Sequence, residues 1–166
     1  MRRLEYRGYD SAGVAVLDKG TVKRVRAVGK IDNLAEKLRH ESAGGTVGIA
    51  HTRWATHGSV TEENAHPHSD CTGNITVVHN GIIENYRELR SAFLSRHTLK
   101  SKTDTEILAH LIEHYYTGDL RLAVEKALSQ VRGTYGVVVM HAEEPHKLVA
   151  ARLGSPLVVG VGENEY

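Results

Sequence analysis

Residues 51–58, with the sequence HTRWATHG, gather side chains that can do chemistry. They follow a run of apolar and small residues at positions 46–50 that is typical of a short buried strand. An arginine just past a strand end, here Arg53, can donate two parallel hydrogen bonds to a carboxylate. It can equally pair with a carboxylate of the protein itself within an ordinary polar loop. The segment alone leaves both interpretations open.

A second candidate is the pair Asn80-Gly81, which follows an apolar run at positions 75–78. Asn-Gly between apolar runs is the commonest short hairpin signal, so a turn is the first interpretation. The alternative is an oxyanion hole, in which the Asn80 side-chain amide and the Gly81 N–H stabilise charge developing on a carbonyl oxygen. Glycine suits that role because a ligand can approach its backbone closely.

Asp104 lies at the predicted start of a helix. A carboxylate in the first helical turn is favourable for the helix dipole alone. If folding places Asp104 opposite Arg53, the two could bind a free amino acid. Arg53 would then hold the α-carboxylate and Asp104 the α-ammonium. Neither residue by itself is evidence for such a site.

The sequence has 11 histidines and one cysteine, so a metal site has to be considered. Five histidines fall in or near the polar segments: His51, His57, His66, His68 and His79. Their spacing matches no zinc pattern such as HExxH or paired CxxC, so neither a metal nor a cofactor is predicted. A Cys71–His nucleophilic pair is an alternative, but nothing in the sequence stabilises a Cys71 thiolate, and we expect that thiol to be inert.

Length and charge limit the remaining possibilities. A chain of 166 residues can bury a substantial core as one domain or most of one. Lys and Arg number 21 against 20 Asp and Glu, which argues against a nucleic-acid or membrane partner recruited by bulk charge. No apolar run approaches the ~18 residues of a membrane span, and no signal peptide is visible. A single cysteine is typical of a protein of the reducing cytoplasm.

Periodicity predicts the elements that must position these residues. Strands are expected at residues 14–17, 21–28, 46–50, 75–78, 135–140, 147–151 and 156–161. Helices are expected at 31–40 and 84–94, after Thr103 with Glu106 as its capping-box partner, and after Asp119 as N-cap. Residues 18–20 predict a three-residue hairpin loop with a bulge. The layout is mixed α+β with a largely antiparallel sheet, or two such sheets stacked.

Six longer motifs together resemble one family. They are RRLEYRGYDSAG at 2–13, HTRWATHG at 51–58, NAHPH at 64–68, VVHNGIIEN at 77–85, SKTDTE at 101–106 and RGTYG at 132–136. In this order they resemble the class II glutamine amidotransferases, and in wording above all the hexosamine-forming branch, the glutamine–fructose-6-phosphate aminotransferases. The match runs nearly from end to end, so chance does not account for it.

The resemblance implies an N-terminal-nucleophile hydrolase fold, a four-layer αββα sandwich of two antiparallel sheets. It assigns the glutamine α-carboxylate to Arg53, the α-amine to Asp104, and the oxyanion hole to Asn80 and Gly81. The other implied site residues are Trp54, Thr56 and His57 in a loop that closes over glutamine, His66 in the adjoining pocket, and Arg7 near the catalytic end.

The implied reaction splits glutamine into glutamate and ammonia through a thioester, without a cofactor. In the family the ammonia passes to fructose 6-phosphate in a separate isomerase domain, giving glucosamine 6-phosphate, and the parent protein is a homodimer. The family's nucleophile is an N-terminal cysteine whose own α-amine acts as base, whereas this sequence begins Met1-Arg2. We therefore expect residues 1–166 to be an incomplete glutaminase domain, truncated at both ends, without isomerase domains and inactive as written.

Two alternatives of other classes stay open at this point. One is a non-catalytic module that binds glutamine through Arg53 and Asp104. The other is a metal-binding domain, which would be purified with bound zinc.

Overall fold

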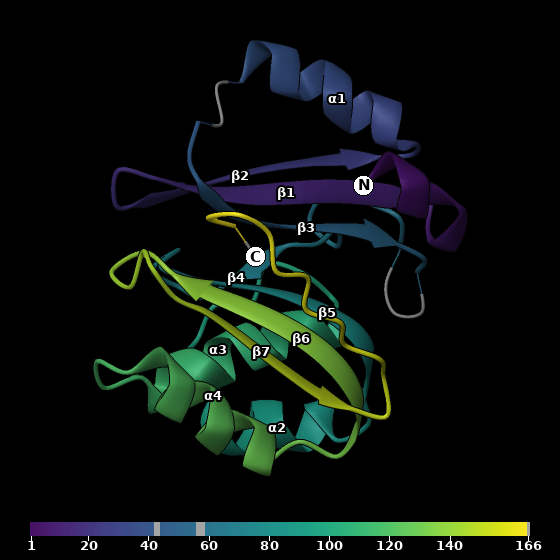
Figure 1. The fold of residues 1–166 in the computed structure, drawn as a ribbon. Coiled ribbons are helices and arrows are strands. Elements are labelled where there is room, and N and C mark those ends of the chain that lie inside the picture. Colours follow the sequence, from purple (N-terminus) through teal and green to yellow (C-terminus); the bar gives the residue numbers. More distant parts are fainter. Residues whose placement is uncertain (42–43, 56–58, 166) are drawn as a thin grey trace.

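Two antiparallel sheets lie face to face, with helices on both outer sides (Figure 1). A computed structural model describes residues 1–41, 44–55 and 59–165, except for the side chain of Arg7. In chain order the elements are η1 (Arg2–Arg7), β1 (Ser11–Asp18), β2 (Thr21–Val28), α1 (Ile31–His40), β3 (Val47–Arg53), β4 (His68–Ser69), β5 (Ile75–Ile83), α2 (Tyr86–Phe93), α3 (Asp104–Tyr115), α4 (Leu120–Ser129), β6 (Gly133–His141) and β7 (Leu148–Leu153).

The first sheet has the strand order β2-β1-β3, with both pairings antiparallel. Strands β1 and β2 are joined by Lys19 and Gly20, whose φ angles are 51° and 78°. Positive φ at both central residues is the signature of a type I′ turn, which follows the natural twist of a hairpin. The predicted three-residue loop with a bulge is therefore wrong. Helix α1 lies where it was predicted and covers the outer face through Ile31 and Leu34.

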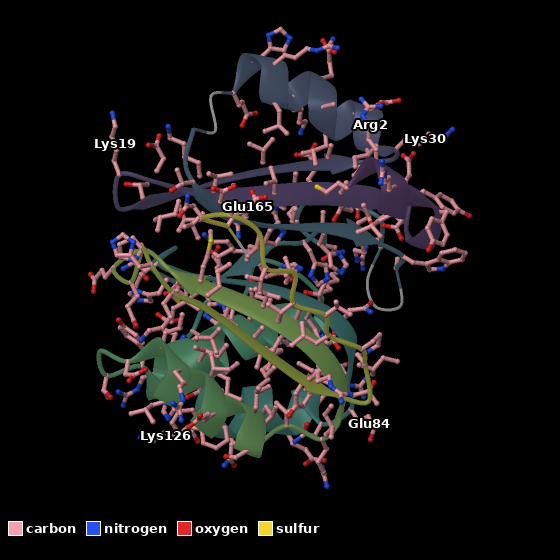
Figure 2. The ribbon with its side chains drawn as sticks, in the orientation of Figure 1. Arg2, Lys19, Lys30, Glu84, Lys126 and Glu165 are labelled. Atoms are coloured by element: carbon pink, nitrogen blue, oxygen red, sulfur yellow. The ribbon has the colours of Figure 1, made fainter. Side chains whose placement is uncertain are left out.

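The second sheet has the order β4-β5-β6-β7 and carries α2, α3 and α4 on its outer face (Figure 1). Helix α3 is buried from Asp104 through Ile112, because it lies between the sheet and its neighbouring helices. The two sheets meet through a small cluster formed by Ala15, Ile49, Val78 and Met140. Figure 2 places four of the labelled charged side chains toward the edges of the view: Lys19, Lys30, Glu84 and Lys126.

Both predicted helix caps exist, one of them only in half. Asp119 accepts hydrogen bonds from the N–H groups of Arg121 (2.9 Å) and Leu122 (3.3 Å) at the start of α4. Thr103 Oγ1 accepts from the N–H of Glu106 (3.4 Å) at the start of α3. The Glu106 carboxylate does not complete the capping box, because it accepts instead from the backbone N–H groups of residues 100 and 101.

The strands differ from the prediction at their ends. Strand β3 runs on through Arg53, and β5 runs on through Asn80 and Gly81 to Ile83. Of the two interpretations of Asn80-Gly81, the hairpin turn is therefore excluded. Both residues pair with β6: Asn80 pairs with Gly136, and Gly81 pairs with Tyr135. Residues 156–161 form no strand, and they begin with a proline that has no N–H to donate to a ladder. None of the described helices is long and apolar enough to cross a membrane.

Candidate functional site

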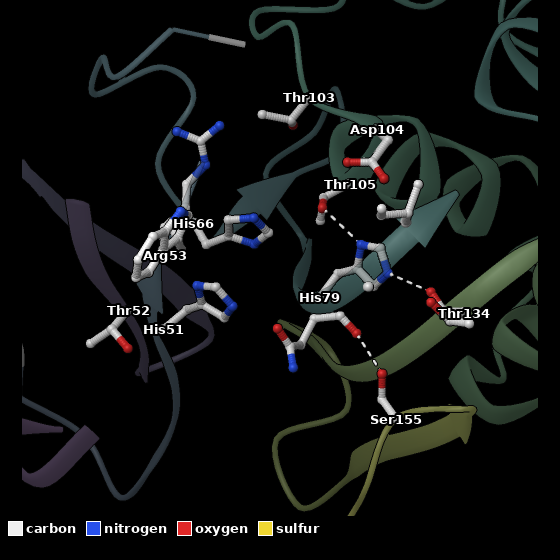
Figure 3. Close-up of a pocket in the computed structure, with 14 residues that line it drawn as sticks. His51, Thr52, Arg53, His66, His79, Thr103, Asp104, Thr105, Thr134 and Ser155 are labelled. Atoms are coloured by element: carbon white, nitrogen blue, oxygen red, sulfur yellow. Dashed lines mark hydrogen bonds between the residues drawn. The ribbon is translucent and has the colours of Figure 1, made fainter. Parts of the chain in front are cut away.

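A cavity of about 330 Å³ opens where β3, β5, β6 and the start of α3 come together (Figure 3). Its lining comes from both sheets, and this explains why the residues are scattered in sequence. The described lining residues are His51, Thr52, Arg53, Trp54, His66, His79, Asn80, Gly81, Ile82, Thr103, Asp104, Thr105, Thr134 and Ser155.

Arg53 is the last residue of β3, and only 4% of it is exposed. The strand fixes its position, since Arg53 is paired with Ser11 of β1. Its Nη1 lies 3.9 Å from Asp10 Oδ1, and Asp10 also accepts from the N–H of Ala55. Burial lowers the pKa of the Arg53 guanidinium, while Asp10 and Asp104 oppose that effect. Arg53 thus has a protein carboxylate at ion-pair distance and also lines the cavity.

Asp104 is the first residue of α3 and is 6% exposed. One carboxylate oxygen accepts from the N–H of Ile83 at 2.8 Å, which anchors the helix start to the end of β5. Figure 3 shows Asp104 and Arg53 on different sides of the cavity, one from the helix and the other from the first sheet. The structure therefore brings together the two residues that the sequence analysis paired.

Asn80 and Gly81 line the same cavity from β5. Asn80 is exposed, and its backbone carbonyl accepts from the Ser155 hydroxyl at 3.1 Å. Gly81 has a φ of 151°, and a Cβ atom built there would lie 2.0 Å from the Thr134 carbonyl oxygen. The neighbouring strand thus requires a glycine at this position, a reason that the sequence did not reveal.

Three histidines form much of the cavity wall, and a fourth, His68, lies buried behind them. His66 stacks on His51 with ring centroids 4.2 Å apart, and His68 contacts His66 edge to face at 4.8 Å. Burial lowers the pKa of His51 to about 4 and that of His68 to about 3, and it holds the pKa of His66 well below its usual range. These imidazoles are neutral at pH 7.

His79 is the third imidazole of the wall, and hydrogen bonds fix its tautomer. Its Nε2 lies 3.5 Å from the Thr134 carbonyl oxygen and its Nδ1 3.0 Å from the Thr105 hydroxyl (Figure 3). A carbonyl can only accept, so Nε2 carries the proton and Nδ1 accepts from Thr105. Burial lowers the pKa of His79, with Asp104 opposing the shift. In sequence, His51 and His79 were candidates only for zinc ligands, and their place in this wall was not predicted.

The predicted closing loop is described only in part. Trp54 lines the cavity, is 61% exposed, and packs edge to face on Tyr9 with ring centroids 5.3 Å apart. Thr56 and His57 lie outside the described residues, as does the side chain of Arg7, so their roles stay predictions. The lining threonines and Ser155 were missed because single hydroxyl residues carry no signal of their own.

Comparison with known proteins decides the family. Residues 51–164 match the glutamine amidotransferase domain. The chain belongs to the glutamine amidotransferase family. A protein of Clostridium tetani named glutamine–fructose-6-phosphate aminotransferase (isomerizing) is 53% identical over 167 residues, covering 100% of this chain and 28% of that protein. A Thermus thermophilus protein of the same name is 55% identical over 166 residues, and the match covers 99% of this chain and 27% of the T. thermophilus protein.

Solved structures agree with that assignment. A glutamine phosphoribosylpyrophosphate amidotransferase from B. subtilis, complexed with ADP and GMP, superposes with a TM-score of 0.75 at 25% identity, covering 90% of this chain and 32% of that one. An allosteric regulatory enzyme of purine biosynthesis gives 0.72 at 26% identity, covering 85% and 31%. The predicted N-terminal-nucleophile hydrolase fold is therefore confirmed. This amidotransferase domain spans 28% of the length of the C. tetani relative.

Proposed function

We propose that the cavity binds free glutamine and that the domain splits its side-chain amide into glutamate and ammonia. The observation that carries this proposal is the charge pattern of the cavity. Arg53 and Asp104 are the charged side chains among its described lining residues, and they have opposite signs. A free amino acid is a zwitterion with one carboxylate and one ammonium group, so its two charges match this pair.

Each charge would bind in its own way. The planar guanidinium of Arg53 can donate two parallel hydrogen bonds to the α-carboxylate, which an ammonium group cannot imitate. Asp104 uses one oxygen for the N–H of Ile83, which leaves acceptor capacity for the α-ammonium. The neutral histidines add no competing positive charge, so they would not repel the ammonium group of the ligand.

The chemistry would take place beside Asn80 and Gly81. A thiolate attacks the amide carbon and the carbonyl oxygen becomes an oxyanion. The amide nitrogen takes the proton that the thiol gave up to its base and leaves as ammonia while a thioester forms. Water then hydrolyses the thioester to glutamate and the free thiol. We propose that the Asn80 amide and the Gly81 N–H donate to that oxyanion. None of the described lining residues carries a thiol. Cys71 contacts His97 and His110 instead, so we propose that Cys71 is not the nucleophile.

The fate of the ammonia is proposed by analogy with the longer relatives named above. We propose that it is passed to fructose 6-phosphate at a site outside residues 1–166, in a homodimeric cytoplasmic protein. The competing proposal is a module that binds glutamine without turnover, which the lack of a thiol in the described lining favours. Ammonia release from glutamine separates them, measured for this chain, its Cys71→Ser variant and a form extended to begin with cysteine. We expect release from the third only, and no release from any form would favour the binding module.

The proposed binding of the two charged groups of glutamine by Arg53 and Asp104 can be tested with two shortened ligands. 4-Aminobutanamide is glutamine without its α-carboxylate, and glutaramic acid is glutamine without its α-amine. Titration calorimetry should show that Arg53→Lys weakens binding of glutamine and glutaramic acid but leaves 4-aminobutanamide unchanged. Asp104→Asn should weaken glutamine and 4-aminobutanamide only. Arg24→Lys is the matched control, because Arg24 is held by Ser69 and does not line the cavity.

Comparing the affinities for the three ligands distinguishes a lost contact from a general loss of structure. A variant that merely loosened the fold would weaken all three ligands together. If Arg53→Lys reduced the affinity for 4-aminobutanamide as much as that for glutamine, Arg53 would not hold the α-carboxylate.

A further inference from the structure

We propose that Cys71, His97, His110 and Glu113 bind a zinc ion at a structural site separate from the glutamine cavity. The four residues are not among those that line the cavity. His97 and His110 are also not among the five histidines considered as zinc ligands from the sequence. Zinc is the metal that a mixed set of thiolate, imidazole and carboxylate ligands favours.

The four ligand atoms converge on one point. Cys71 Sγ lies 3.5 Å from Nδ1 of His97 and 3.5 Å from Nδ1 of His110. Glu113 Oε2 lies 3.0 Å from each of the same two nitrogens. All four atoms fall within 4.8 Å of one another. A tetrahedron with Zn–S near 2.3 Å and Zn–N or Zn–O near 2.0 Å has edges of about 3.3–3.6 Å. The two sulfur–nitrogen separations match these edges, the two nitrogen–oxygen separations are shorter, and the remaining pairs, which are up to 4.8 Å apart, would adjust when an ion binds.

Folding, rather than sequence spacing, assembles this set. His110 and Glu113 are three residues apart on α3 and so share one face of the helix. Cys71 comes from the loop between β4 and β5, and His97 from the loop between α2 and α3. No compact motif therefore marks the site in the sequence. An ion held there would tie both loops to α3.

The surroundings orient two of the ligands. His110 is 1% exposed, and its Nε2 lies 3.7 Å from Glu106 Oε1, so the other nitrogen faces the cluster. A carboxylate that accepts from the second ring nitrogen is the usual outer partner of a zinc-bound histidine, and a small shortening of this 3.7 Å separation would make that hydrogen bond. Glu106 is itself fixed by the N–H groups of residues 100 and 101 at 2.7 and 2.5 Å. The N–H of Cys71 donates to Glu113 Oε2 at 3.2 Å.

A cluster of ordinary hydrogen bonds is the competing explanation. In that case two imidazoles and a backbone N–H would share one oxygen of Glu113. A cation at the centre explains why both Nδ1 atoms and the sulfur point to the same place. Four protein ligands fill a tetrahedral site, so the ion would support the structure and carry no substrate.

Metal analysis of the whole chain tests the proposal. The protein is loaded with zinc, dialysed against metal-free buffer and analysed by mass spectrometry. We expect about one zinc per chain in the wild type, and background levels in Cys71→Ser and in His97→Ala. His146→Ala is the matched control and should keep its zinc, because His146 is an exposed histidine outside the cluster.

Cobalt provides a second readout that needs no variant to fold. Co²⁺ in the wild type should show the visible bands of a tetrahedral ion together with thiolate-to-cobalt charge transfer. Wild-type protein without zinc after loading, equal zinc in all four proteins, or a cobalt spectrum without thiolate charge transfer would each overturn the proposal. If Cys71→Ser or His97→Ala is unfolded by circular dichroism, the wild-type cobalt spectrum decides.

Discussion

Replacing Gly81 with alanine should cost the protein much of its stability. The new Cβ would lie 2.0 Å from the Thr134 carbonyl oxygen and 2.9 Å from Nε2 of His79. The φ angle of 151° is also one that residues with a side chain rarely adopt. Backbone strain of this kind costs roughly 1–3 kcal/mol, and forcing an extra carbon into a packed site costs about 1–3 kcal/mol more. We therefore expect a loss of about 2–6 kcal/mol in the free energy of unfolding, against a typical total of about 5–15 kcal/mol.

Urea unfolding followed by circular dichroism measures this loss. Gly73→Ala is the matched control, because Gly73 also has a positive φ of 80° but its Cβ would meet nothing within 4 Å. It carries a conformational cost of roughly 1–2 kcal/mol without a steric contact, so a loss in Gly81→Ala well above that value reports the crowding against β6. Equal losses in the two variants would refute the claim that the Thr134 carbonyl is what excludes a side chain at position 81.

Three further outcomes are expected. Asn80→Ala, in a form that releases ammonia, should lower kcat by roughly 10²–10³ with little change in KM or melting temperature; a lower melting temperature with normal turnover would contradict the oxyanion role. Asp119→Ala should lose about 1 kcal/mol of unfolding free energy through its cap on α4, seen as a lower urea midpoint. The pKa of His68 is about 3 in the fold and ~6.5 when unfolded. Stability should therefore fall as the pH drops below ~6.5, and His68→Gln should flatten that slope by up to about 1.4 kcal/mol per pH unit, as measured by urea midpoints between pH 7 and 4.5.

Much of the fold was predictable because periodicity and caps are local signals. Helix α1 has the predicted bounds, and Asp119 caps α4 as expected. The errors arose where pairing with a distant strand overrode a local signal. The dipeptide Asn80-Gly81 is a common turn sequence, yet pairing with β6 keeps both residues in β5. The two-residue strand β4 is held by Val77 and Thr76 of β5, and nothing in its own short sequence could reveal it.

The site was predictable where its residues lie in motifs that resemble the family or carry a charge. Their opposite charges predicted that Arg53 and Asp104 could act together, and the two residues do line one cavity. The roles of His51 and His79 were not predicted, because a histidine has the same letter whether it binds a metal, carries a charge or is buried as a neutral ring. Only burial separates these states, and burial depends on the packing of one sheet on the other.

The neutral histidines also affect how strongly Arg53 and Asp104 would attract a zwitterionic ligand. Burial disfavours protonation of His51, His66 and His79, so the wall is polar but uncharged. In such a partly desolvated cavity, an attraction between opposite charges is worth more than it would be in water. A ligand with only one charge could interact favourably with Arg53 or with Asp104, but not with both. The same burial that neutralises the histidines would therefore favour a zwitterion over simple acids and amines.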